Sequence, residues 1–197
     1  MWIYEKKLQY PVHIKNPNPA LAKLIMSQYG GPHGELGASL RYLSQRYSMP
    51  YPELRAILTD IGTEELAHLE MVGTIVYQLT RNLTQEEIQK QGFDAYFIDH
   101  TTGVYPVAAS GAPFSAACIA VTGDTLADIN EDLAAEQKAR VTYDNILRFA
   151  DDPDVRDPIK FLREREIVHY QRFGEGLRIA TDRLDSKNFY AFNPSFD

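Results

Sequence analysis

Glu65-Leu66-Ala67-His68 and Glu166-Ile167-Val168-His169 carry the same Glu-x-x-His pattern, 101 residues apart. Thirty residues before the first pattern stands Glu35, and thirty residues before the second stands Glu136. Both halves of the chain therefore repeat one spacing of carboxylate and imidazole side chains. A lone histidine on an apolar face is usually a core residue, but six residues of metal-ligand type on a repeated spacing favour a metal site.

The middle of each thirty-residue interval is a turn signal. Pro50 lies midway between the two glutamates of the first half, inside Ser48–Pro52, and Asp151 lies midway in the second half, inside Ala150–Asp154. If helices run to each turn and back, both glutamates of a half stand roughly 20 Å from the turn at 1.5 Å per residue, and they meet at one level. Each half is predicted to be an antiparallel helix pair.

Two such pairs predict an all-α fold, a ferritin-like four-helix bundle. Dinuclear carboxylate proteins of that fold place a Glu on each of two helices and a Glu-x-x-His on the two others. We expect a single domain over residues 1–197, with an extended N-terminal arm at 1–18 and a long crossover at 82–123 between the helix pairs. Gly30-Gly31-Pro32 is expected to kink or break the first helix just before its glutamate.

The apolar pattern places the six residues inside the bundle. On the second expected helix, Glu65 and His68 fill the gap in an apolar stripe. The stripe consists of Leu54, Ile57, Leu58, Ile61, Val72, Ile75, Val76 and Leu79. Four carboxylates in one core would repel each other and lose hydration, at roughly several kcal/mol per ion. Two divalent cations would neutralise them, and two imidazoles would complete the coordination without adding charge.

Composition limits the other possibilities. The 197 residues are 44% hydrophobic and 24% charged, which suits one compact core, and the formal charge of −7 gives no basic surface for nucleic acid. The single cysteine, Cys118, excludes an internal disulfide and fits a reducing compartment. The N-terminus lacks the apolar run of a signal peptide, and no segment has the apolar length of a membrane span. We expect a soluble cytoplasmic protein without a membrane partner.

Two segments lie outside the expected helix pairs. The arm is rich in Tyr, Pro and Asn, and its aromatic side chains need a surface to cover, for which another subunit is a candidate. The crossover is too long for an ordinary bundle loop. Thr84 is expected to cap a short helix within it, and Asp124 to cap the third long helix. The mostly small or apolar stretch Pro106–Ile119 either crosses the bundle end, covers the metal site or packs between subunits.

The remaining acids and histidines lack the repeated spacing. Acids close to the six residues are interpreted as solvated or ion-paired: Glu64, Glu70, Asp132 and Glu164. The other histidines are interpreted as loop or surface residues: His13, His33 and His100.

Three segments also resemble a known family. Gly30–Ala38, Asp60–Glu70 and Ala135–Arg140 are similar to the manganese catalases, and the opening Met1–Val12 resembles their spore-coat CotJC-like branch. The resemblance spans nearly the whole chain. It implies two manganese ions per chain, disproportionation of hydrogen peroxide, and a homo-oligomer that in this family is typically a hexamer. It also implies assembly into a spore coat with other coat proteins.

Matched motif by motif, the resemblance implies roles for particular residues. The metal ligands fall on Glu35, Glu65, His68, Glu136 and His169, with Glu65 bridging the metals. Glu166 corresponds to an acid outside the metal's own ligands that handles protons, and Tyr42 to a tyrosine that hydrogen-bonds the carboxylates. Some members place an arginine where this chain has Ala135, so gating or tuning by that arginine is absent here.

Two other functions use the same residues. A di-iron ferritin-like peroxidase or oxidase would take all six as ligands, and raw affinity favours iron over manganese at such a site. A structural spore-coat protein would keep the metals only as a staple. Elemental analysis separates the first from a catalase, and oxygen release separates the second.

Overall fold

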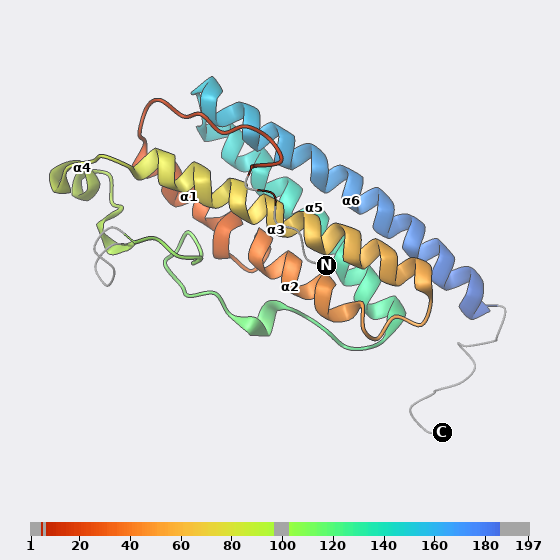
Figure 1. Ribbon diagram of the computed structural model, residues 1–197. Coiled ribbons are helices and arrows are strands. Elements are labelled where there is room, and N and C mark those ends of the chain that lie inside the picture. Colours follow the sequence, from red (N-terminus) through yellow and green to blue (C-terminus); the bar gives the residue numbers. More distant parts are fainter. Residues whose placement is uncertain (1–4, 6, 97–102, 186–197) are drawn as a thin grey trace.

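The computed structural model describes residues 5, 7–96 and 103–185. These residues form helices with an isolated bridge between Val107 and Pro113, which confirms the expected all-α class (Figure 1). The helices are α1 (Pro19–Gly30), α2 (Glu35–Gln45), α3 (Pro52–Thr80), α4 (Gln85–Lys90), η1 (Asp94–Tyr96), η2 (Ala116–Cys118), α5 (Thr125–Phe149) and α6 (Pro153–Asp185). None of these helices is long and apolar enough to span a membrane.

The helix ends lie where the sequence signals predict them. The turn around Pro50 separates α2 from α3, and the turn around Asp151 separates α5 from α6. Asp124 caps α5 by accepting a hydrogen bond from the backbone of Ala127. The glycine-proline segment breaks the first helix, since α1 ends at Gly30 and α2 begins again at Glu35. Thr84 forms the expected capping box at the start of α4.

Four rods make up the bundle. In Figure 1, α1 and α2 follow one another in one direction and run antiparallel to α3, and α5 runs antiparallel to α6. The same view shows that α3 and α5 run in the same direction. After the end of α3, the chain must therefore travel back along the length of the bundle before α5 can begin. This arrangement explains the length of the crossover, because no short loop can join the end of one helix to the distant start of a parallel one.

The crossover returns along α2 rather than across the bundle end. Buried Arg41 of α2 donates hydrogen bonds to the backbone carbonyls of Cys118 and Ile119, at 2.6 and 3.1 Å. Gln45, one turn further along α2, donates to the carbonyl of Ala120. The crossover therefore lies over the helix that carries Glu35. Residues 97–102 of the crossover, including His100, are outside the described part of the chain.

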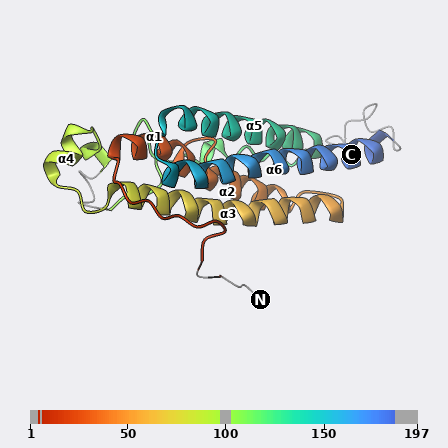
Figure 2. The same ribbon diagram turned by 90° about the horizontal axis from the view of Figure 1, so that it is seen from above.

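The N-terminal arm, from residue 7 onwards, packs against the helices of its own chain (Figure 2). The surface that the arm covers therefore belongs to the same chain and not to a second subunit. The side chain of Gln78 on α3 accepts from the backbone of Ile14 and donates to that of Val12. Tyr10 stacks on Phe161 of α6, with ring centroids 4.8 Å apart. The arm thus crosses the outer seam between α3 and α6.

Two apolar clusters fill the bundle on either side of a polar middle. Along α3, the first cluster contains Leu54, Leu58 and Ile61, and the second cluster contains the buried apolar residues between Met71 and Leu79. Along α6, Ile159 and Leu162 lie in the second cluster and Phe173 in the first. The residues between these stretches are the candidate site residues.

Gly30 tests the packing of the crossover on the bundle. A Cβ atom at Gly30 would lie 2.3 Å from the backbone of Pro106 and Val107. Gly30→Ala should therefore lower the free energy of unfolding by roughly 1–3 kcal/mol, the usual cost of overpacking. Gly174→Ala in α6 is the matched control, because its Cβ meets nothing within 4 Å. It should stabilise by up to about 1 kcal/mol through helix propensity. Urea unfolding of both variants measures the difference, and equal stability would contradict the close approach.

Candidate metal centre

Four helices each bring part of the candidate site to the bundle centre. Glu35 begins α2, Glu65 and His68 lie on α3, Glu136 on α5, and Glu166 and His169 on α6. Each of these six side chains is at most 1% exposed. The spacing of three places each glutamate and histidine of a Glu-x-x-His pattern on one helix face.

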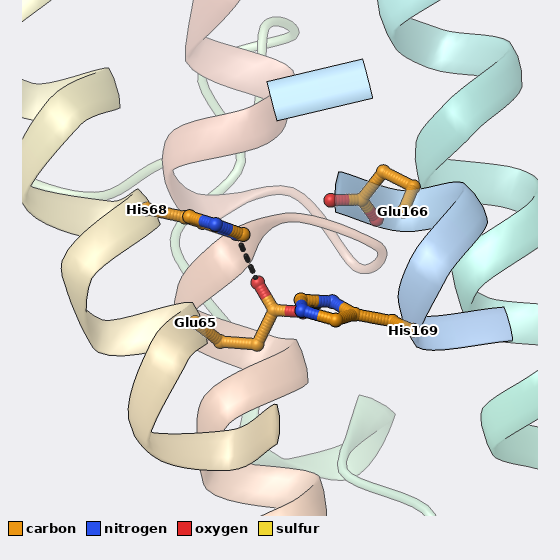
Figure 3. Close-up of side chains that lie close together, drawn as sticks. All are labelled: Glu65, His68, Glu166 and His169. Atoms are coloured by element: carbon orange, nitrogen blue, oxygen red, sulfur yellow. Dashed lines mark hydrogen bonds and ion pairs between the residues drawn. The ribbon is translucent and has the colours of Figure 1, made fainter. Parts of the chain in front are cut away.

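The carboxylate of Glu65 lies between the two histidines (Figure 3). Its Oε2 is 2.9 Å from Nδ1 of His68, and its Oε1 is 2.8 Å from Nδ1 of His169. The two imidazole rings are nearly parallel, with centroids 5.5 Å apart. Glu166 completes a group of four side chains whose potential ligand atoms all lie within 4.8 Å of one another. These four side chains could hold a metal ion.

The two outer glutamates each lie beside one histidine. Glu35 Oε2 is 4.0 Å from Nδ1 of His68, and Glu136 Oε2 is 3.5 Å from Nδ1 of His169. All six residues singled out in the sequence are therefore brought together. The pairing follows the two halves of the chain, since Glu35 on α2 lies beside His68 on α3, and Glu136 on α5 lies beside His169 on α6.

Two tyrosines hold the outer glutamates in place. Tyr42 on α2 donates a hydrogen bond to Glu136 on α5, as the family resemblance implies. Tyr143 on α5 donates to Glu35 on α2 in return. The sequence analysis did not single out Tyr143. The signal was available, because each tyrosine follows the glutamate of its own half by seven residues.

Protons alone balance the buried charge in the absence of a cation. Burial, followed by repulsion from neighbouring carboxylates, raises the pKa of Glu35, Glu136 and Glu166. Burial acts on Glu65 in the same direction, but the charges of His169 and His68 hold its pKa below the usual range. Burial alone would lower the histidine pKa, yet Glu65 raises that of His68 and brings that of His169 to about 12. The central carboxylate thus favours the charged form of both histidines, and the histidines favour the charged form of Glu65.

The donor set fits divalent cations. Glu166 Oε1 is buried at the centre and has no hydrogen-bond partner among the described residues. Three further inward atoms, Glu65 Oε1, Glu136 Oε2 and His169 Nδ1, meet only one another, at ion-pair distances of 2.8 and 3.5 Å. Unpaired buried carboxylate and imidazole atoms are costly unless something binds them. Oxygen and nitrogen donors of this kind suit manganese, iron and similar ions.

The comparisons with known proteins agree with this geometry. A family profile described as manganese containing catalase matches residues 1–189. The chain belongs to the manganese catalase family. Protein CotJC of Bacillus subtilis (strain 168) is 50% identical over 190 residues, which cover 96% of this chain and all of that protein. A probable manganese catalase of Clostridium acetobutylicum is 35% identical and covers 96% of this chain and 85% of its own length.

A solved structure confirms the fold. Wild-type KatB, a manganese catalase from Anabaena, superposes with a TM-score of 0.82 at 31% sequence identity, over 95% of this chain and 81% of that one. The expected ferritin-like bundle and the resemblance to manganese catalases are both confirmed.

Glu64 is one group whose importance the sequence interpretation missed. It is ion-paired as expected, with Arg165 of α6, but it also faces both histidines. Burial would raise the pKa of Glu64, and the hydrogen bonds from His169, His68 and Arg165 hold it well below the usual range. Glu64 is therefore an ionised carboxylate directly behind the imidazole rings.

Asp132 is also placed differently from the expectation. The interpretation of Asp132 as a solvated or ion-paired surface acid is wrong, because its side chain is fully buried on α5, one turn before Glu136. Burial raises its pKa well above the usual value, and the nearby Gln45 and Arg41 oppose that rise. Of the other acids, Glu70 and Glu164 are exposed as expected.

The remaining histidines do not join the site. His13 is exposed, which agrees with a loop residue. His33 is half-buried in the break between α1 and α2, where burial and then the charges of Lys138 and Arg41 lower its pKa.

The pKa directions predict that metal binding releases protons. The carboxyl groups of Glu35, Glu136 and Glu166 and both imidazoles have raised pKa values, so each holds its proton more tightly than a free group does and must lose it to bind a cation. Manganese affinity should therefore fall as the pH is lowered. Titration calorimetry with Mn²⁺ in two buffers of different ionisation enthalpy measures the release. Identical heats in the two buffers would contradict the protonated site.

Proposed function

We propose that the chain is a dimanganese catalase, which disproportionates hydrogen peroxide to water and oxygen. The observation that carries the proposal is the buried set of four glutamates and two histidines around Glu65, in a chain of the manganese catalase family. In the overall reaction, one peroxide molecule gains two electrons and becomes water while another loses two electrons and becomes oxygen.

Five side chains are proposed to hold the metals: Glu35, Glu65, His68, Glu136 and His169. Glu65 suits the bridging role, because its two carboxylate oxygens face different histidines. A pair of manganese ions would supply the two-electron chemistry by cycling between a reduced and an oxidised state. Tyr42 and Tyr143 fix the orientation of Glu136 and Glu35 through their hydroxyl groups.

Glu166 is proposed to handle protons at the centre. Burial and the carboxylates of Glu136 and Glu35 raise its pKa well above that of a free glutamate, so it accepts a proton more readily than a free glutamate does. Its Oε1 is buried and has no hydrogen-bond partner within the described chain, so this atom is available to a bound substrate or solvent molecule. One of the two protons released when peroxide is oxidised can be held on Glu166 and returned when peroxide is reduced, and the other must leave to solvent or to another base.

Oxygen release from peroxide by the manganese-loaded protein tests this function directly. Glu166→Gln should keep two metals per chain but slow oxygen release by about 10²-fold or more, because the amide preserves shape without accepting a proton. Glu65→Ala is the contrasting variant and should lose the metals, since three acids would then face one another without the central carboxylate. Elemental analysis measures both metal contents.

Each alternative function predicts a different result. Loss of metal from Glu166→Gln would make Glu166 a ligand and favour a di-iron peroxidase or oxidase, an arrangement compatible with its place in the group of four. Two bound manganese ions without oxygen release would favour a structural protein stapled by metal. Growth with both metals, followed by elemental analysis, tests manganese against iron.

We also propose a homo-oligomer, with a hexamer as the size suggested by the family. Large apolar side chains are exposed on several faces, among them Tyr47, Tyr77, Tyr105, Val121 and Phe149. We further propose assembly into a spore coat, on the ground of the 50% identity to CotJC. Light scattering at micromolar concentration should give a mass several times that of the 22.4 kDa chain. A strictly monomeric mass would contradict this proposal.

A further inference from the structure

Glu64 lies directly behind both histidines of the candidate metal centre. Its Oε2 is 3.1 Å from Nε2 of His169, and its Oε1 is 3.6 Å from Nε2 of His68. The opposite ring nitrogens, the Nδ1 atoms, face Glu65. Each imidazole is thus placed between the central carboxylate and Glu64, with the same nitrogen turned inward in both halves.

Two further contacts fix the carboxylate of Glu64. Arg165 donates to both of its oxygens, from Nε at 2.7 Å and from Nη2 at 3.1 Å. Gln9 of the N-terminal arm donates to Oε1 at 2.7 Å. The Glu64 side chain is 18% exposed, so it lies at the edge of the core and under the arm. A two-point contact with a guanidinium group fixes direction as well as position.

Glu64 and Arg165 occupy equivalent places in the two halves of the chain. Each directly precedes the glutamate of a Glu-x-x-His pattern. Two carboxylates at these places would repel each other across the seam between α3 and α6. Glu64 and Arg165 carry opposite charges and attract each other instead. The two oxygens of the one carboxylate, that of Glu64, then face the two histidines.

We propose that Glu64 is the positioning residue for both histidines of the metal centre. A neutral imidazole binds a metal through one nitrogen and carries hydrogen on the other, and a carboxylate on that N–H fixes the tautomer and the ring orientation. Glu64 holds the proton on Nε2 of each ring, through a hydrogen bond to His169 and an ion-pair contact with His68, so Nδ1 is the nitrogen that gives up its proton when a metal binds. This inference rests on the proposed metal site, and it assigns one residue of α3 to ligands on two helices.

Glu64→Gln tests the assignment through metal affinity. The amide has one acceptor oxygen, and its NH₂ group would face the N–H of the second histidine. The Mn²⁺ dissociation constant, measured by chelator competition, should rise about 10- to 100-fold while two ions still bind at saturation. Glu70→Gln is the matched control, because it removes the same charge from an exposed position on α3 and should change affinity by about twofold at most.

Arg165→Gln distinguishes positioning from simple cross-linking of α3 and α6. This variant breaks the ion pair but leaves the Glu64 carboxylate behind the histidines, so it should weaken Mn²⁺ binding less than Glu64→Gln. If both variants lower the stability of the metal-free protein and the metal affinity equally, the pair is only a cross-link and the proposal is overturned.

The experiment separates this proposal from the proposed function. Tight Mn²⁺ binding by Glu64→Gln, equal to that of Glu70→Gln, would overturn the role of Glu64 and leave the catalase proposal intact. Failure of the unmodified protein to bind Mn²⁺ would overturn both. If Glu64→Gln does not fold, Glu64→Asp gives the same comparison, since it keeps the charge for Arg165 but withdraws the oxygens from the histidines.

Discussion

The enclosure of four carboxylates in one apolar bundle is the constraint on which the rest of the structure depends. Glu35, Glu65, Glu136 and Glu166 are all buried. The apolar clusters on either side exclude water, so hydration cannot offset the charge of these carboxylates. The compensation must come from groups within the bundle or from bound cations. Two imidazoles and two tyrosine hydroxyls converge on these carboxylates, so the polar middle is organised by charge balance as much as by shape.

The twofold repeat in the sequence becomes an approximate symmetry of contacts. Tyr42 and Tyr143 exchange partners across the bundle, each holding the glutamate of the other half. Such reciprocal bonds tie α2 to α5, which are not neighbours in the chain. The symmetry fails where Glu64 faces Arg165, and there the difference in charge turns a potential repulsion into an ion pair. The two halves are therefore specialised for each other rather than duplicated.

Spacing alone predicted much of this structure. The interval of thirty residues and the turn signals at its midpoints gave the helix pairs, and the glycine-proline segment gave the break before Glu35. The burial of Asp132 was also legible, because it precedes Glu136 by four residues and so shares its face. The path of the crossover could not be predicted from the sequence, because it depends on which backbone carbonyls Arg41 reaches after the helices dock. The same holds for the contact of Glu64 with His169, which joins two helices from different halves.

The parallel course of α3 and α5 has a consequence for how the molecule folds. Each antiparallel helix pair is made of contacts that are close in sequence, and such contacts form fastest. The candidate site draws its residues from both pairs, so it is complete only after the two pairs have docked and the crossover has been laid along α2. Docking brings the like-charged glutamates together and is opposed by their repulsion, while the apolar clusters on either side drive it. We therefore expect the site to form late in folding. Ions that bind only the complete site would stabilise the docked state of the two helix pairs.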